Sequence, residues 1–182
     1  YQQLNTAVLQ IENEFYGTIR PKRSAASGER PLAALGKSGV EYVEVRCVDL
    51  DPFEPIGINS EQIRFLDTFL LLCLLTESPT DSREESARMV RNQTAVVERG
   101  RQPGLVLERD TESVDLRQWA TELLDQCTYI AEVLDRHAAN NFYSQTLAAQ
   151  KAKVKDPEST PSAKVIAALN EGSSFFDFTM HN

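Results

Sequence analysis

Polar and apolar side chains alternate in two stretches of this sequence, residues 9–16 and 39–46. Because successive side chains of a strand point to opposite faces, each stretch predicts a strand with one apolar face and one polar face. The polar set of the two stretches comprises Gln10, Glu12, Glu14, Tyr16, Tyr42, Glu44 and Arg46. A sheet face with carboxylates, a guanidinium and phenols could handle a metal ion or an anion.

The composition limits which partners such a face could serve. The chain has 182 residues, 19 of them Lys or Arg and 27 Asp or Glu, for a formal net charge of −8. This excess of acid argues against a nucleic-acid partner or an anionic membrane surface. A bound phosphate would therefore need local basic residues or a metal ion. The cysteines, Cys47, Cys73 and Cys127, show neither metal-ligand nor disulfide spacing, so a cytoplasmic location is expected.

The elements that must position the polar face are two strands in the first third of the chain. Residues 4–16 alternate throughout and predict one strand, and residues 40–50 predict the second. Residues 17–36 are expected to form a long connection with a mobile Ser/Gly segment and a turn of helix from residue 31 to 35. The prolines at 52 and 55 are expected to end the second strand.

Helical periodicity replaces alternation from residue 59 onward. Helices are expected from Asn59 or Ser60 to Pro79, over 82–99, from Thr111 or Ser113 to 137, over 142–154, and from 161 to Gly172. The inner stripe of the helix over 82–99 is expected to comprise Ala87, Val90, Thr94 and Val97. The inner stripe of the long helix that ends at residue 137 is expected to comprise Leu116, Trp119, Leu123, Leu124, Cys127, Ile130, Ala131 and Leu134.

One apolar segment, residues 69–75, has no polar face and is expected to be buried on several sides, against the apolar side of the sheet. It is too short to cross a membrane, which takes about 20 apolar residues.

These elements predict an α+β fold, with two strands of an antiparallel sheet followed by a mainly helical region of about five helices. Residues 1–58 would form a partial sheet that carries half of an active site, and residues 59–182 would be the helical support of the same domain. Two strands alone are only marginally stable in water, and the chain begins with Tyr1 rather than Met. We therefore expect a piece of a longer protein, with an N-terminal part missing.

Several motifs resemble the bacterial-type glutamate–cysteine ligase family. They are Leu-Gln-Ile-Glu-Asn-Glu-Phe-Tyr and Ile-Arg-Pro-Lys-Arg within residues 5–23, and Gly-Val-Glu-Tyr-Val-Glu-Val-Arg within 39–53. The resemblance continues through residues 62–67 and 98–105, and fades after about residue 108. It implies a curved antiparallel sheet and an ATP-dependent ligase. Such an enzyme joins the γ-carboxylate of glutamate to the amine of cysteine through a γ-glutamyl phosphate, with magnesium, as the first step of glutathione biosynthesis.

The resemblance also implies roles for individual residues. Glu44 matches a magnesium ligand, and Arg46 matches a catalytic arginine that faces the nucleotide phosphates and the intermediate. The remaining implied roles are substrate binding by Tyr16 and Arg20 and nucleotide binding by Lys22 and Arg23. A single Glu-x-Arg cannot hold two or three magnesium ions, so the isolated piece is expected to be inactive.

Two other interpretations stay open at this point. Glu44 and Arg46 could form an ion pair on a solvated sheet face, and the chain could be a non-catalytic helical interaction module. A related carboxylate–amine ligase with another acceptor amine is the third possibility.

Overall fold

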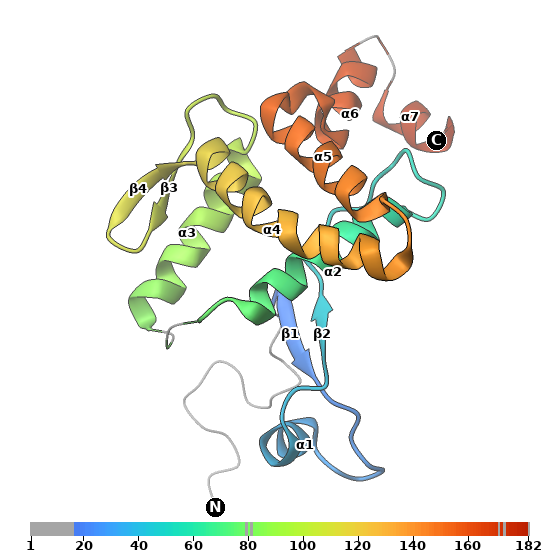
Figure 1. Ribbon diagram of the computed structural model, residues 1–182. Coiled ribbons are helices and arrows are strands. Elements are labelled where there is room, and N and C mark those ends of the chain that lie inside the picture. Colours follow the sequence, from blue (N-terminus) through green and yellow to red (C-terminus); the bar gives the residue numbers. More distant parts are fainter. Residues whose placement is uncertain (1–16, 79, 81, 171, 173, 182) are drawn as a thin grey trace, which may run out of the picture. The chain divides into compact units, whose positions relative to one another are not determined.

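The chain divides between residues 50 and 51 into two units (Figure 1). The computed structural model describes residues 17–182 apart from 79, 81, 171, 173 and 182. The expected strand over residues 4–16 lies outside the described residues. Two antiparallel strand pairs and seven α-helices confirm the predicted α+β class for the part described.

The first unit contains strand β1 (Ile19–Lys22), helix α1 (Pro31–Ser38) and strand β2 (Tyr42–Val45), and the two strands pair antiparallel. Helix α1 confirms the expected turn of helix after residue 31 and extends it. It ends at Gly39, whose φ of 76° is a left-handed value that favours glycine. The expectation of a strand from 40 to 50 was too long, because β2 pairs with β1 over four residues only.

The prediction of a continuous connection over residues 17–36 was wrong at β1. Pro21 holds Arg20 in an extended conformation, and it lies opposite Val43 in the ladder. The backbone N–H of Arg46 donates to the carbonyl of Thr18, which makes that opposite pair a hydrogen-bonded one. Bonded and non-bonded pairs alternate in an antiparallel ladder, so Pro21 falls at a non-bonded pair and withholds no hydrogen bond from β2.

The core of the second unit is made by three helices, α2 (Ser60–Leu75), α4 (Leu116–Ala138) and α5 (Phe142–Lys155), which contact one another. Asn59 begins α2 with a capping box, in which its side chain accepts from Gln62 N–H and the Gln62 side chain accepts from Asn59 N–H. The buried residues of this core are Leu124, Cys127, Ala131 and Leu147. The predicted inner stripe of the long helix is thereby confirmed in its central turns.

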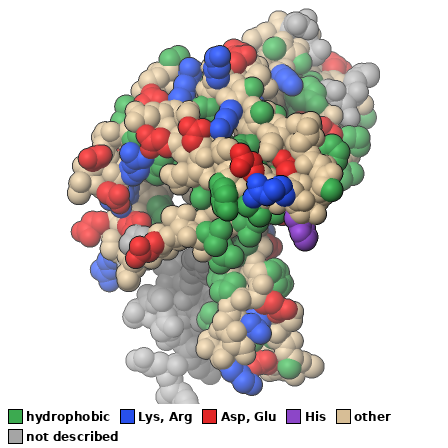
Figure 2. Space-filling view, viewed as in Figure 1, with side chains coloured by type: hydrophobic (Ala, Val, Ile, Leu, Met, Phe, Trp, Pro, Cys, Tyr) green, Lys and Arg blue, Asp and Glu red, His purple; other side chains and the backbone are tan. Residues whose placement is uncertain are grey.

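The end of α2 differs from the prediction that residues 69–75 are buried on several sides. Leu74 is 77% exposed and Leu75 is 75% exposed. Figure 2 shows hydrophobic side chains gathered on the surface over α2, while acidic and basic side chains are interspersed elsewhere on the face shown. Within the second unit α2 packs on α4 and α5 through Phe65, Phe69 and Leu72, while Leu74 and Leu75 at its end stay exposed.

A second, smaller core lies beside helix α3 (Arg83–Arg99). Strands β3 (Val106–Arg109) and β4 (Glu112–Asp115) form a hairpin closed by a two-residue turn, and Leu105, Leu107 and Val114 are buried beneath it. The expectation that Thr111 or Ser113 begins a helix was wrong, because this segment alternates as β4 and Asp115 caps α4 instead.

The packing face of α3 was also predicted wrongly. Val90 is 61% exposed and Val97 is 79% exposed. The face that contacts the hairpin carries Asn92 and Ala95, and the Asn92 side chain both donates to and accepts from the backbone of Glu108. The contact of α3 with the hairpin is thus made by a face that includes a polar side chain, whereas the apolar periodicity predicted a different face of the helix.

The chain continues through a 3₁₀ turn (Pro157–Ser159), α6 (Pro161–Asn170) and α7 (Phe175–His181). Pro161 at the first position of α6 confirms the predicted start of that helix. Helix α7 was not predicted. Among the described residues, no helix is both long and apolar enough to span a membrane.

Candidate functional site

The β1–β2 ladder brings the described candidate residues onto one sheet face. Arg20 lies opposite Glu44, and Lys22 lies opposite Tyr42. Residues directly opposite in an antiparallel pair share a face, and alternation puts Arg46 on the same face as Glu44. Four of the six candidate residues of the sequence analysis are therefore collected on the polar face of β1–β2.

Glu44 lies at the centre of this polar face. Its Oε2 is shielded from solvent, 3.2 Å from Nζ of Lys22 and 3.9 Å from Nη1 of Arg20. The pKa of the Glu44 carboxyl lies below its ordinary value, first because Lys22 contacts it at hydrogen-bonding distance. Desolvation opposes this lowering, and the positive charges of Lys22, Arg46 and Arg20 add to it. Glu44 is consequently an ionised carboxylate at neutral pH.

Among the residues that the structure describes, the polar face carries more positive than negative charge. In residues 17–50 Arg20, Lys22 and Arg46 contribute three cations to this face, and Glu44 contributes one carboxylate. Guanidinium groups bind carboxylate and phosphate oxygens bidentately, and an ammonium binds them as a point charge. In a chain with a net charge of −8, such a local excess of cations favours a small anionic ligand.

Arg23 is held away from this arrangement by the backbone. Its Nη1 donates to the carbonyl oxygens of Ser38, at 2.7 Å, and Gly39, at 3.0 Å. The backbone N–H of Ser24 donates to Glu41, and this hydrogen bond is the main reason that the pKa of Glu41 is lowered. We call Arg23, Ser24 and Glu41 the loop clamp, because they tie the two ends of the connection between β1 and β2 together.

Sequence reasoning left open a cross-strand or same-face ion pair for Glu44, but it did not predict that the partners are Lys22 and Arg20. The missing step was the register of β1, since residues 17–36 were expected to be a connection. The signal was present as the alternation of Thr18, Arg20 and Lys22. Tyr16, the remaining candidate residue, lies outside the described residues.

A magnesium ion fits this face only as one that is shared with other groups. Glu44 offers a hard, ionised carboxylate, the ligand type that magnesium prefers. Within the described ranges, no three His, Cys, Asp or Glu side chains are grouped closely enough to hold a metal ion. The described residues could therefore supply one ligand of a magnesium site, with the others coming from substrate, water or further carboxylates.

Comparison with known proteins identifies the family. The family model described as glutamate-cysteine ligase matches residues 1–96, which include β1, β2 and the polar face. The chain belongs to this family. A glutamate–cysteine ligase of Azotobacter vinelandii is 52% identical over 179 residues, and one of Pseudomonas fluorescens is 49% identical over 179 residues.

The family relatives are much longer than this chain. In both alignments 98% of the chain is covered but only 34% of the relative, so the chain spans about a third of their length. A crystal structure of glutamate–cysteine ligase from Francisella tularensis in complex with AMP resembles the chain with a TM-score of 0.81 and 39% identity. The structural match covers 94% of this chain and 34% of the Francisella tularensis chain.

Proposed function

We propose that the chain is part of an ATP-dependent carbon–nitrogen ligase that joins the γ-carboxylate of glutamate to the amine of cysteine in the cytoplasm. The product would be γ-glutamylcysteine, the first intermediate of glutathione biosynthesis. The observation that carries the proposal is the cationic polar face of β1–β2, which lies inside the segment matched by the family model. The AMP in the Francisella tularensis structure supports a nucleotide as one ligand.

The reaction requires groups that hold two anions close together. An oxygen of the glutamate γ-carboxylate attacks the γ-phosphorus of ATP, and ADP leaves with the electrons of the broken P–O bond. The cysteine amine then attacks the acyl carbon, phosphate leaves and the amine loses a proton. Positioning and charge neutralisation supply most of the catalysis in such phosphoryl transfers.

The residues of the polar face would divide this work. Arg46 would hold the phosphate oxygens and the acyl phosphate, and Arg20 would bind the substrate carboxylate. Lys22 would neutralise nucleotide phosphate, and Glu44 would keep Lys22 and Arg20 close to each other while serving as one magnesium ligand. When bound, magnesium would withdraw charge from the phosphate oxygens.

Tyr16 and Arg23 complete the proposed set of ligand-binding residues. Tyr16 is proposed to line the cysteine site. Arg23 is proposed to bind nucleotide as well, but this requires its guanidinium to give up the carbonyl oxygens of Ser38 and Gly39.

The division of labour along the chain is also a proposal. Residues 1–58 would carry one side of the active site, and residues 59–182 would be its helical support within the same domain. The relatives are about three times as long, and the part that this chain does not include would supply the remaining metal ligands. We therefore expect the 182-residue chain alone to hydrolyse no ATP in response to glutamate.

A chimera tests the proposal directly. The 179 aligned residues of the Azotobacter vinelandii ligase are exchanged for this chain, and ADP release is measured with glutamate and cysteine present. We expect ADP release that depends on both amino acids, and a product with the mass of γ-glutamylcysteine. A folded chimera without ADP release would instead favour the non-catalytic interaction module, and turnover with a different amine would indicate another acceptor.

A point variant of the chimera tests the contribution of the polar face to the rate of ADP release. Glu44→Gln should lower the rate of ADP release at least about 100-fold, because a charged ligand of the reacting groups is lost. Glu132→Gln removes an exposed carboxylate on α4 and is the matched control, expected to keep the parent rate. Equal rates for Glu44→Gln and Glu132→Gln would refute the role given to Glu44.

A further inference from the structure

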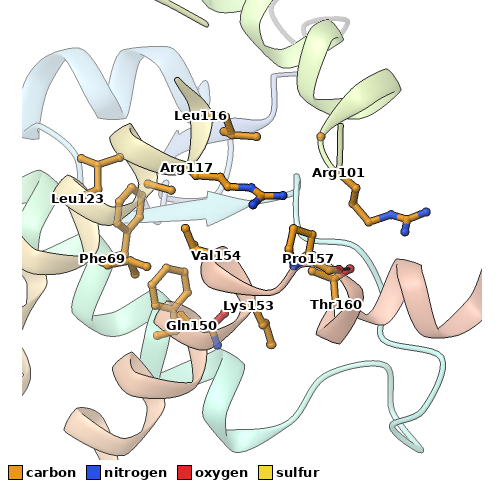
Figure 3. Close-up of a pocket in the computed structure, with 14 residues that line it drawn as sticks. Phe69, Arg101, Leu116, Arg117, Leu123, Gln150, Lys153, Val154, Pro157 and Thr160 are labelled. Carbon is orange, nitrogen blue, oxygen red and sulfur yellow. Dashed lines mark hydrogen bonds between the residues drawn. The ribbon is translucent and has the colours of Figure 1, made fainter. Parts of the chain in front are cut away.

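A cavity of about 410 Å³ lies in the second unit, between helices α2, α4 and α5. Its walls are mainly apolar, with Phe69 from α2, Leu123 from α4 and Val154 from α5 (Figure 3). The volume falls in the range of about 300–1,000 Å³ that is usual for small-molecule pockets. None of the residues of the polar face lines this cavity, so the nucleotide and substrate roles proposed above leave it unexplained.

The charged residues that line the cavity are all basic. Among the 14 lining residues are Arg101, Arg117 and Lys153, and none is acidic, although the chain as a whole has a net charge of −8. Figure 3 shows Arg117 extending from α4 toward Pro157, above Val154. The cavity therefore combines apolar walls with a positively charged border.

Two of these cations lack an ion-pair partner among the residues that the structure describes. Arg101 lies 3.4 Å from Glu158 and is paired with it. In the part of the chain that the structure describes, the side chains of Arg117 and Lys153 have no acidic partner within ion-pair distance. Both residues are partly buried, where a charge is less screened than on an open surface.

We propose that this cavity binds a small monocarboxylic acid with a hydrocarbon chain. The chain would lie against the apolar walls, and the carboxylate would lie at the positively charged border to which Arg117 and Lys153 belong. A guanidinium matches a carboxylate bidentately. A singly charged head group is favoured over a phosphate dianion, because partial burial of the larger charge costs more desolvation free energy. The site is separate from the ligase chemistry and does not depend on it.

The first experiment compares two ligands of equal length and opposite charge. Decanoate and decylammonium are titrated separately into the 182-residue chain below their micelle concentrations, and heat and methyl NMR shifts are recorded. We expect decanoate to bind at least about tenfold more tightly, since only its head group complements the two cations. Equal affinity for both ligands, or no binding of decanoate, would overturn the proposal.

Variants of the lining residues test whether decanoate binds in this cavity. Arg117→Gln and Lys153→Gln should each weaken decanoate binding about fivefold or more, by loss of a charge-assisted contact. Lys155→Gln is the matched control, because it removes the same charge from the same helix at a position that does not line the cavity. Ala120→Phe should fill the cavity and abolish binding. Circular dichroism confirms that each variant is folded, and a loss of affinity in Lys155→Gln equal to that in Lys153→Gln would contradict the assignment.

The alternative occupant is protein. The same titration is therefore repeated on the chimera, which includes the remaining two-thirds of the Azotobacter vinelandii ligase. Retained decanoate binding supports a small-molecule site in the complete protein. If the isolated chain binds decanoate and the folded chimera does not, the cavity is filled by another part of the ligase and the proposal fails.

Discussion

Asp135, near the end of α4, is the residue whose replacement we expect to destabilise the helical unit most clearly. It is only 8% exposed, and its carboxylate accepts the backbone N–H groups of Tyr143 at 2.8 Å and Ser144 at 3.0 Å. These groups belong to the first turn of α5, whose own N-cap residue, Asn141, makes no capping hydrogen bond with its side chain. Asp135 therefore caps α5 from the preceding helix.

The expected cost of Asp135→Ala follows from these two hydrogen bonds. Hydrogen bonds to a charged group contribute about 1.5–3 kcal/mol each, and loss of a helix cap costs about 0.5–2 kcal/mol. Because N–H groups of a first turn can bind water once the carboxylate is gone, we expect a loss of about 2–4 kcal/mol in the free energy of unfolding. For a chain of this length that corresponds to a fall in Tm of about 5–12 °C.

The assay is urea unfolding followed by far-ultraviolet circular dichroism. Asp125→Ala is the control, since Asp125 is on the same helix and its side chain, paired with Lys151, is 63% exposed. An exposed pair of this kind is worth less than about 1 kcal/mol. If Asp135→Ala and Asp125→Ala lose equal stability, the capping role of Asp135 is refuted.

The capping role also predicts a pH dependence. Burial raises the pKa of Asp135, but hydrogen bonds from Ser144 and Tyr143 outweigh it and hold the pKa below its ordinary value. A carboxyl with a depressed folded-state pKa contributes stability above its unfolded-state pKa, and this contribution is lost as the pH falls through the folded-state value. The difference in unfolding free energy between the parent and Asp135→Asn should therefore be largest near neutral pH and shrink in acid.

Three further predictions concern other contacts. Arg23→Ala removes the hydrogen bonds to the end of α1 and should lower the kcat of the active chimera, whereas the exposed Arg30→Ala should not. An unchanged kcat would contradict both the support of the polar face by the loop clamp and the nucleotide role proposed for Arg23. Asn92→Ala breaks two hydrogen bonds between α3 and β3 and should lower the free energy of unfolding by about 1–2 kcal/mol. Replacing the exposed neighbour, Gln93→Ala, should leave it almost unchanged, and chemical denaturation measures both values. Cys127 is fully buried, and burial raises the pKa of its thiol. An aromatic disulfide reagent should therefore leave Cys127 unmodified in the folded chain, while the exposed Cys47 and Cys73 react. Three reactive thiols before unfolding would contradict the packing of α4.

The sequence by itself determined the local features of this protein. The α+β class, the capped starts of α2 and α6, and the buried stripe of α4 follow from periodicity and capping residues that lie within a few positions of one another. Local hydrogen bonds and helical spacing are enough for such inferences. The parity of Tyr42, Glu44 and Arg46 likewise predicted which side chains share a face.

Only the tertiary structure decided which distant residues meet. The contact of Glu44 with Lys22 depends on the register of β1 against β2. The packing of α3 against β3 depends on the hydrogen bond that the side-chain amide of Asn92 donates to the backbone carbonyl of Glu108. The exposed end of α2 was read from its composition as core. Apolarity predicts that a segment tends to be buried, but the partner that buries it, and its alignment with that partner, are set by the packing of the whole chain.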